Sequence, residues 1–404
     1  MTEVTGLPYA ARRTDDVRLT AGVSAAHFVS HFYILVLPPV FAFVRADYGV
    51  SYTQLGLAIT VFMVVSALFQ TPAGFLVDRY NARLILVAGL ICGAAGLVLA
   101  AVVNSYWVLV LTFGLMGLGN TVYHPADYAL LSRHVASERI GQAYSVHTFA
   151  GLLGGAMAPA AMLFMHGMFG WRGAFIGAAV LGCAVAAVLL VVHEGPQEHP
   201  VKPRDSGASP AVADWRLLLS APILINFLFY VLMAFSSFGF QNFSVVALGA
   251  LYGTPASTAN AALSGYLFLS AFGVLAGGWI STRTTLHGVV AAMGLFGAAL
   301  STLMIGSMNL GATALVVVAS LGGLCLGAIM PARDLIVRAV TPPGAFGRVF
   351  GFVTNGFNIG GIVSPLVFGA LMDHGQPALV FIVVALGGVA GILTVASMPR
   401  RRSA

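Results

Sequence analysis

Charged residues are scarce in this sequence. Asp, Glu, Lys and Arg make up 8% of its 404 residues, against 59% that are hydrophobic, whereas an ordinary soluble domain is about a quarter charged. So few charges cannot cover a surface that faces water, which excludes a soluble globular protein. Apolar runs of about 20 residues or more, the length that crosses a bilayer core as a helix, recur along the whole chain. We therefore expect an integral membrane protein.

Alternation of polar and apolar residues is also lacking. The strands of a membrane β-barrel are segments of about ten residues with alternating polarity, whereas residues 84–103 are apolar on every side. Because lipid offers no partner to backbone groups, a span must be a helix or part of a closed barrel. The sequence therefore predicts an all-α membrane protein.

Other absences exclude classes of function. The cysteines Cys92, Cys183 and Cys325 lie inside apolar runs and form no metal-type pair. The sequence has no phosphate-binding glycine loop, no cleavable signal pattern and no polar segment long enough for a catalytic domain. We expect no enzyme activity, no catalytic residue, no cofactor and no resident metal.

Twelve apolar runs are each long enough to span a bilayer as a helix. They are 20–44, 52–77, 83–103, 107–131, 140–165, 172–192, 218–247, 256–281, 287–307, 311–337, 345–371 and 377–397.

The net charge of +6 follows membrane topology rather than nucleic-acid binding. An even number of spans places both termini on one side, and only Arg45 and Arg172 lie on the other. By the positive-inside rule both termini and the central loop are cytoplasmic, and no nucleic-acid partner is expected. The basic residues on the cytoplasmic side include Arg79, Arg83, Arg133, Arg139, Lys202, Arg204, Arg216, Arg283, Arg338, Arg348 and Arg400–Arg402.

The two halves of the chain repeat each other. Gly141, Gly154 and Gly155 match Gly347, Gly360 and Gly361 at one constant offset, which also carries Pro125 onto Pro331. Duplicated halves with a substrate site between them are a known plan of transporters. The stretch between them is rich in Pro, Gly, Ser and charge, as linkers are. We expect a cytoplasmic tail at 1–19, six-helix bundles at 20–192 and 218–397, a cytoplasmic linker at 193–217 and a basic tail at 398–404.

The loop between the second and third spans carries a motif. Gly74-Phe75-Leu76-Val77-Asp78-Arg79-Tyr80-Asn81-Ala82-Arg83 resembles the signature loop of the major facilitator superfamily. Its final glycine is replaced by Asn81, which also tolerates a left-handed turn. The resemblance implies that Gly74 allows two helices to approach closely and that Asp78, Arg79 and Arg83 form cytoplasmic ion pairs that hold one conformation shut. Alternatively, these charges only set topology.

A narrower resemblance is to the fosmidomycin-resistance type of drug exporter. It rests on Ala26-His27-Phe28 in the first span and on Tyr123-His124-Pro125-Ala126-Asp127 in the fourth. It implies a bacterial inner-membrane protein that exports a small molecule.

Four histidines lie inside spans of the N-terminal half: His27, His31, His124 and His147. At 1.5 Å per residue they lie about 10–17 Å from the cytoplasmic ends of their helices, in one layer. Histidine titrates near physiological pH, and ionisable groups within a membrane are candidates for function. We expect this layer to couple transport to protons. Each ring could instead donate to a carbonyl of a neighbouring helix, and with Asp127 the histidines could hold a divalent metal ion.

Two charged positions correspond in the two halves. Asp127 lies near the cytoplasmic end of its helix, shortly before Arg133, and both residues are assigned to the cytoplasmic gate. Asp127 is expected to pair there with Arg79 or Arg83 rather than to contact the substrate. The repeat places Arg333 at the matching position, where it is expected either to form a salt bridge across the halves or to bind an anion. A local pair of Arg333 with Asp334 is not expected, because neighbours on a helix point apart.

Uncharged polar groups complete the predicted path. Asn355 and Asn358 share one helix face and either orient a substrate or join helices. The hydroxyl groups of Tyr33 and Tyr123 are expected in apolar surroundings, where each either contacts an amphiphilic ligand or packs.

These features predict a transporter that works by alternating access. We expect a monomer in the lipid bilayer that uses the proton gradient to export a small organic molecule, anionic or amphiphilic, in exchange for protons. An importer of organic acids and a divalent-metal transporter remain as alternatives.

Overall fold

A computed structural model of the chain describes residues 9–136, 138–192, 215–342 and 346–397. Regular secondary structure within these ranges is entirely helical. The elements are α1 (Tyr9–Ile34), η1 (Pro38–Val40), α2 (Phe41–Tyr48), α3 (Tyr52–Arg79), α4 (Ala82–Val102), α5 (Tyr106–Asn120), α6 (Tyr123–His134), α7 (Ile140–Val191), α8 (Trp215–Leu218), α9 (Ala221–Tyr252), α10 (Ala256–Ser281), α11 (His287–Ser307), α12 (Ala312–Val340), α13 (Phe346–Asp373) and α14 (Pro377–Ala396).

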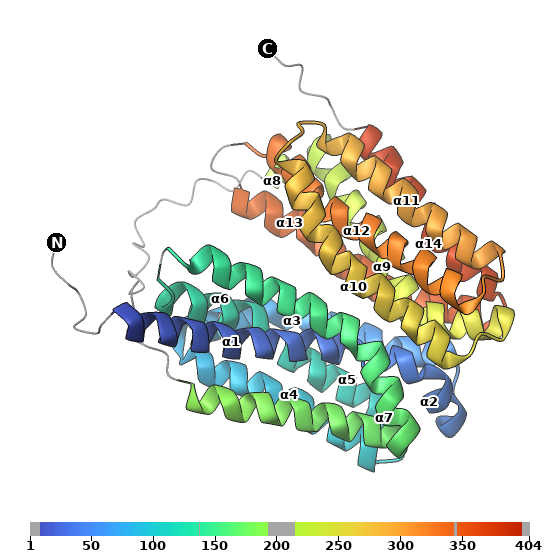
Figure 1. Cartoon of the computed structure of the whole chain (residues 1–404), viewed down its shortest axis with the longest axis horizontal. Helices are drawn as coiled ribbons and strands as arrows, with labels where there is room; N and C mark the ends of the chain where they lie inside the picture. Colours follow the sequence, from blue (N-terminus) through green and yellow to red (C-terminus); the bar gives the residue numbers. More distant parts are fainter. Residues whose placement is uncertain (1–8, 137, 193–214, 343–345, 398–404) are drawn as a thin grey trace. The chain divides into compact units, whose positions relative to one another are not determined.

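The expected all-α membrane fold is confirmed. The described residues contain 11 helical stretches long and apolar enough to cross a membrane. One of them, α7, has 52 residues, about 78 Å of helix against a bilayer core of about 30 Å. Gly170 interrupts α7 with a φ of 70° and a ψ of 174°, a backbone conformation that glycine adopts readily because it has no Cβ atom. Figure 1 shows α7 folding back on itself. The 11 stretches therefore supply the twelve expected crossings.

Two of the expected spans are interrupted. The first breaks at Pro38 and Pro39, which form η1 between α1 and α2, since proline lacks the backbone N–H that a continuing helix needs. The fourth divides into α5 and α6 after Asn120. Most other helix ends lie within a few residues of the expected limits, but α1 begins at Tyr9 rather than at residue 20.

The described residues form two compact units. Unit 1 contains the described residues within 1–36, 64–158 and 164–211. Unit 2 contains the described residues within 37–63, 159–163 and 212–404. Residues 37–63 pack with the C-terminal half: Thr60 donates to the carbonyl of Ile362 at 3.0 Å. Asp373 accepts from the backbone N–H groups of Tyr52 and Thr53 at 2.7 and 2.8 Å, so its carboxylate satisfies free N–H groups at the start of α3.

The expected domain limits stay a prediction. Residues 1–8 of the tail, 193–214 of the linker and the tail at 398–404 lie outside the described residues. The described end of the linker region belongs to α8.

Glycines set the spacing of helices in unit 1. A Cβ atom at Gly154 would collide with the backbone carbonyl of Phe28, and one at Gly151 would lie 2.6 Å from Cε1 of His27. Small residues at a membrane helix interface allow this close approach. The two glycines therefore bring α7 directly against the part of α1 that carries His27.

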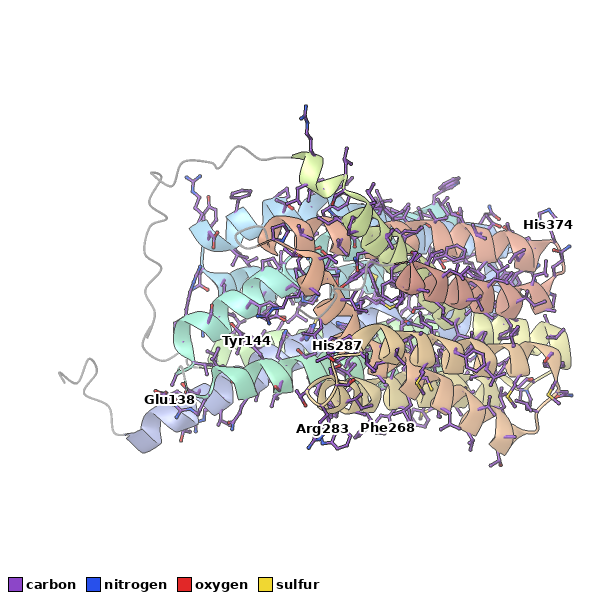
Figure 2. All side chains as sticks on the ribbon, turned by 90° about the horizontal axis from the view of Figure 1, so that it is seen from above. Glu138, Tyr144, Phe268, Arg283, His287 and His374 are labelled. Carbon is purple, nitrogen blue, oxygen red and sulfur yellow. The ribbon has the colours of Figure 1, made fainter. Side chains whose placement is uncertain are left out.

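Apolar side chains cover the outside of unit 2. Phe268 on α10 is exposed, and Figure 2 shows it projecting outward, with Arg283 beyond the end of the same helix. Lipid is the expected neighbour of such a surface, and a terminal arginine is typical of a helix end at the membrane border.

Candidate functional site

The four predicted histidines come together inside unit 1. We call His27, His31, His124 and His147 the histidine cluster. The rings of His27 and His147 stack with centroids 3.8 Å apart and planes 11° apart. The centroids of His31 and His124 lie 4.7 and 5.2 Å from that of His27. The predicted layer therefore exists, built from α1, α6 and α7.

The ring of His27 also forms the hydrogen bond that was the alternative role expected of these histidines, a bond to a backbone carbonyl of a neighbouring helix. Nδ1 of His27 lies 2.9 Å from the backbone oxygen of His147. Because a carbonyl only accepts, Nδ1 must carry the hydrogen, which leaves Nε2 of a neutral ring as an acceptor. That Nε2 is buried and has no hydrogen-bond partner among the described residues. His27 is thus held by one nitrogen while the other remains able to take a proton.

Asp127 belongs to this cluster and not to the gate, so the expected pair with Arg79 or Arg83 was wrong. Its side chain is completely buried, and Oδ2 lies 3.8 Å from Nε2 of the equally buried His147. Residues turn by about 100° each along a helix, so Asp127 and Arg133 on α6 point in different directions. Neither oxygen of Asp127 accepts a hydrogen bond within the described part of the chain. A buried carboxyl with no such partner is costly to ionise, as expected of a functional group.

Three members of the cluster approach the arrangement of a metal site. His27, His124 and His147 each offer a ligand atom, and these atoms lie within 4.8 Å of one another. Nitrogens on one tetrahedral zinc ion lie about 3.3 Å apart, given Zn–N bonds of about 2.0–2.1 Å. The rings would have to move to hold a metal ion with this geometry.

Aromatic rings border the cluster. Tyr128 on α6 has its ring centroid 5.6 Å from that of His147 and 5.1 Å from that of Tyr144. Tyr128 and His124 are exposed, and polar side chains within a span face water or the protein interior rather than lipid. Tyr128 and His124 therefore form the exposed side of the cluster.

The two tyrosines predicted on the path are both buried. Tyr33 donates to the carbonyl of Ala178 at 3.2 Å, and its ring contacts Gly93 and Gly182, where a Cβ atom would collide with it. The hydroxyl of Tyr123 has no hydrogen-bond partner among the described residues. Packing and the bond to Ala178 account for Tyr33, and a substrate contact of either residue stays a prediction.

The predicted gate loop forms an ion pair. Asp78 Oδ1 lies 3.5 Å from a terminal nitrogen of Arg133, with the aspartate side chain largely exposed. Arg79 lies over the ring of Tyr80, with Cζ 5.7 Å from the ring centroid, and Arg83 donates to the carbonyl of Val192 at 2.6 Å. Arg133 is thus the observed partner of Asp78.

One expectation for the gate loop, the left-handed turn at Asn81, was wrong. Asn81 is extended, with a φ of −65°, and its side chain caps α4 by accepting from the N–H of Leu84, a common role of asparagine at a helix start. A Cβ atom at Gly74 would meet no described atom of its own unit within 4 Å. The close helix approach expected of Gly74 therefore stays a prediction.

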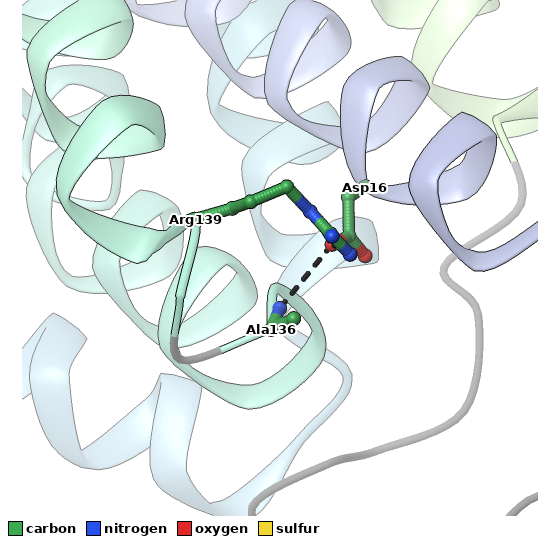
Figure 3. Close-up of polar contacts among 3 residues, drawn as sticks. All are labelled: Asp16, Ala136 and Arg139. Carbon is green, nitrogen blue, oxygen red and sulfur yellow. Dashed lines mark hydrogen bonds and ion pairs between the residues drawn. The ribbon is translucent and has the colours of Figure 1, made fainter. Parts of the chain in front are cut away.

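A second ion pair of unit 1 was missed by the sequence analysis. Asp16 on α1 accepts from Nε of Arg139 at 2.8 Å, from a terminal N–H of the same guanidinium and from the backbone N–H of Ala136 at 3.3 Å (Figure 3). From the sequence, Asp16 is expected in a cytoplasmic tail and Arg139 is expected only to set topology. The contact ties the early turns of α1 to the connection between α6 and α7.

Unit 2 contains a compact charged group, the Arg333 cluster, formed by Tyr230, Arg333 and Asp334. Nε of Arg333 donates to Oδ1 of Asp334 at 2.9 Å, and the hydroxyl of Tyr230 donates to the same oxygen at 2.7 Å. The expectation that these neighbours do not pair was wrong. The long arginine side chain bends across the ring of Tyr230, with Cζ 4.4 Å from the centroid, which brings Nε back to Asp334.

The predicted asparagines lie near this cluster. Nδ2 of Asn358 donates to Oδ1 of Asn355 at 3.3 Å on α13. Phe357, the neighbour of Asn358, has its ring centroid 6.0 Å from Cζ of Arg333. A polar stretch of α13 therefore lies beside the Arg333 cluster within unit 2.

Twelve apolar crossings and ionisable side chains buried within them define a multi-pass membrane transporter. The chain belongs to the Major Facilitator Superfamily, whose family model matches residues 23–254 and 230–404. It is a transporter and not an enzyme.

Known proteins with similar sequences or folds agree with this family. The chain is 25% identical over 399 residues to the fosmidomycin resistance protein of Escherichia coli (strain K12), covering 96% of this chain and 95% of that protein. The crystal structure of the nucleoside transporter NupG has a TM-score of 0.76 at 14% identity, covering 94% of this chain and 98% of that one. That of a bacterial homologue of the human lysosomal transporter Spinster has a TM-score of 0.74 at 17% identity, covering 97% and 95%. The two structures support the fold alone.

Proposed function

We propose that this transporter is a proton-coupled antiporter, which exports a small anionic or amphiphilic organic molecule in exchange for protons by alternating access. The observation that carries the proposal is the buried contact of Asp127 with His147 inside the histidine cluster. A proton taken up there changes the charge of a site that lies within membrane-spanning helices. Conformations that differ in how well they solvate this charge then differ in proton affinity, which is the condition for coupling.

The substrate side of the proposal rests on Arg333. A guanidinium group recognises carboxylates and phosphonates through paired N–H donors, and an arginine inside a span marks a substrate path more often than a lipid contact. The export direction is taken from the resistance named for the Escherichia coli relative. The orientation with both termini cytoplasmic, from the distribution of basic residues, and a monomeric state are parts of the same proposal.

Vesicle transport tests the direction. Everted membrane vesicles containing the protein, with an acidic interior, should accumulate fosmidomycin, and dissipating the pH gradient should abolish the accumulation. Fosmidomycin entry into right-side-out vesicles together with protons would contradict export and favour the importer.

Metal transport remains a second candidate because three histidine ligand atoms lie within 4.8 Å of one another. The same vesicles test it with Zn²⁺ or Ni²⁺ in place of fosmidomycin. Accumulation of these ions, but not of fosmidomycin, would replace the proposed function by metal transport.

A further inference from the structure

The Arg333 cluster presents two unlike charges on one accessible face of unit 2. The side chain of Asp334 is 50% exposed and that of Arg333 is 13% exposed. Both lie on α12, within a span. A half-exposed carboxylate is too costly to leave in lipid, so this face borders water. A ligand dissolved in that water meets both groups at once.

The hydrogen bonds within the cluster leave Asp334 able to accept a further hydrogen bond and Arg333 able to donate further ones. Oδ1 of Asp334 accepts from both Arg333 and Tyr230, which leaves Oδ2 as the oxygen for a further donor. Asp334 accepts a hydrogen bond from the Nε–H of Arg333, which is one of five N–H donors on a guanidinium group. The terminal amino groups remain to bind an acid group from outside.

Tyr230 fixes the geometry of both charges. Its ring lies under the guanidinium at 4.4 Å, where the electron-rich face attracts a cation, and its hydroxyl holds Asp334 at 2.7 Å. Phe357 lies 6.0 Å from the same guanidinium carbon. Because these contacts position the pair before a ligand arrives, little side-chain freedom remains to be lost on binding.

We infer that Arg333 and Asp334 form a paired-charge subsite, which selects molecules that carry an acid group beside an ammonium or another hydrogen-bond donor. Arg333 binds the acid group and Oδ2 of Asp334 accepts from the donor. A ligand with two acid groups is disfavoured, because its second charge meets Asp334. This inference rests on the proposed transport function and narrows its substrate class from anions in general to zwitterions and donor-bearing acids.

Three sulfonates on one carbon skeleton test this selectivity, since their sulfonate charges are fixed at neutral pH. The probes are 3-aminopropane-1-sulfonate, propane-1-sulfonate and propane-1,3-disulfonate, titrated calorimetrically into the purified full-length protein at pH 7. The wild type should bind the amino compound about tenfold more tightly than propane-1-sulfonate, the gain expected of one charge-assisted hydrogen bond. The disulfonate should bind most weakly.

Variants assign this preference to the two residues. Asp334→Asn should reduce the tenfold ratio to about one while retaining propane-1-sulfonate binding. Arg333→Gln should abolish binding of all three probes. Tyr230→Phe keeps the ring but removes the hydroxyl that holds Asp334, so the ratio should fall to about threefold. Arg283→Gln, an exposed arginine of the same unit, is the control and should leave the ratio unchanged.

The wild-type ratio decides the inference even if a variant fails to fold. Equal binding of the amino compound and propane-1-sulfonate, or binding of no probe, overturns the paired-charge subsite, and so does an unchanged ratio in folded Asp334→Asn. These titrations contain no pH gradient. Failure of the proposed proton coupling would appear instead in the vesicle assay, so the two failures are distinguishable.

Discussion

Asp127 on α6 and His147 on α7 face each other in the interior of unit 1, with Oδ2 of the aspartate 3.8 Å from Nε2 of the histidine and both side chains fully buried. Neither forms a side-chain hydrogen bond within the described residues. The stacked ring of His27 closes the other side of His147. An acid and a base whose side chains form no other hydrogen bonds are suited to exchange a proton with each other when the conformation changes.

Removal of the acid should uncouple transport. Asp127→Asn keeps the size of the side chain but cannot ionise, so gradient-driven accumulation of fosmidomycin in everted vesicles should fall about tenfold or more. Exchange of labelled for unlabelled fosmidomycin without a gradient should persist, because it needs no net proton movement.

Glu138→Gln is the matched control for this substitution. Glu138 is an exposed acid in the connection between α6 and α7 (Figure 2), and its substitution should leave both activities unchanged. Full gradient-driven accumulation by Asp127→Asn would remove this residue from the coupling mechanism.

The contact of α7 with His27 should be sensitive to a single methyl group. In Gly151→Ala the added Cβ would lie 2.6 Å from Cε1 of His27, and such overpacking costs about 1–3 kcal/mol. Thermal unfolding in detergent should show a lower midpoint, with loss of gradient-driven transport. At Gly141, on the same helix, a Cβ meets no described atom within 4 Å. Gly141→Ala should therefore be neutral or slightly stabilising, and an equal drop in both variants would speak against the contact.

The gate pair should affect transport more than stability. Asp78 is largely exposed in its contact with Arg133, and exposed ion pairs contribute only about 0–1 kcal/mol. Asp78→Asn and Arg133→Gln should each unfold near the wild-type temperature yet transport fosmidomycin more slowly. The exchange variant Asp78→Arg with Arg133→Asp should recover part of the rate. Wild-type transport by Asp78→Asn would show that these charges serve topology alone.

The pair of Asp16 and Arg139 should affect stability more than transport. Its side chains are mostly buried, and removing one partner of such a pair leaves an uncompensated charge that costs about 1–3 kcal/mol after allowance for partial exposure. Asp16→Asn should lower the unfolding midpoint, whereas the neighbouring substitution Asp15→Asn should not. If both variants unfold at the wild-type temperature, the pair does not stabilise unit 1.

Much of the fold could be predicted because lipid imposes strong limits on sequence. Spans such as 256–281 and 287–307 coincide with α10 and α11, since apolar length alone decides where a helix crosses. The early start of α1 escaped prediction because Asp16 and its polar neighbours resemble a solvated tail. Only the partner Arg139, distant in sequence, explains how such residues belong to a helix.

The histidine layer was predictable from depth, but its partners were not. Counting residues along each helix places His27, His124 and His147 at similar heights, which the ring contacts bear out. Rotation of a helix about its axis is set by packing, so the inward direction of Asp127 was not visible in the sequence. The pair of Arg333 with Asp334 depends likewise on the ring of Tyr230, which lies on another helix.

Proton movement in proteoliposomes tests the central claim most directly. A pH-sensitive dye inside vesicles that contain the purified protein should report proton counter-movement when a fosmidomycin gradient is imposed on the wild type. The signal should be absent in His147→Gln and unchanged in His166→Gln, a histidine elsewhere on α7. Wild-type proton movement in His147→Gln would contradict coupling through the contact of Asp127 with His147.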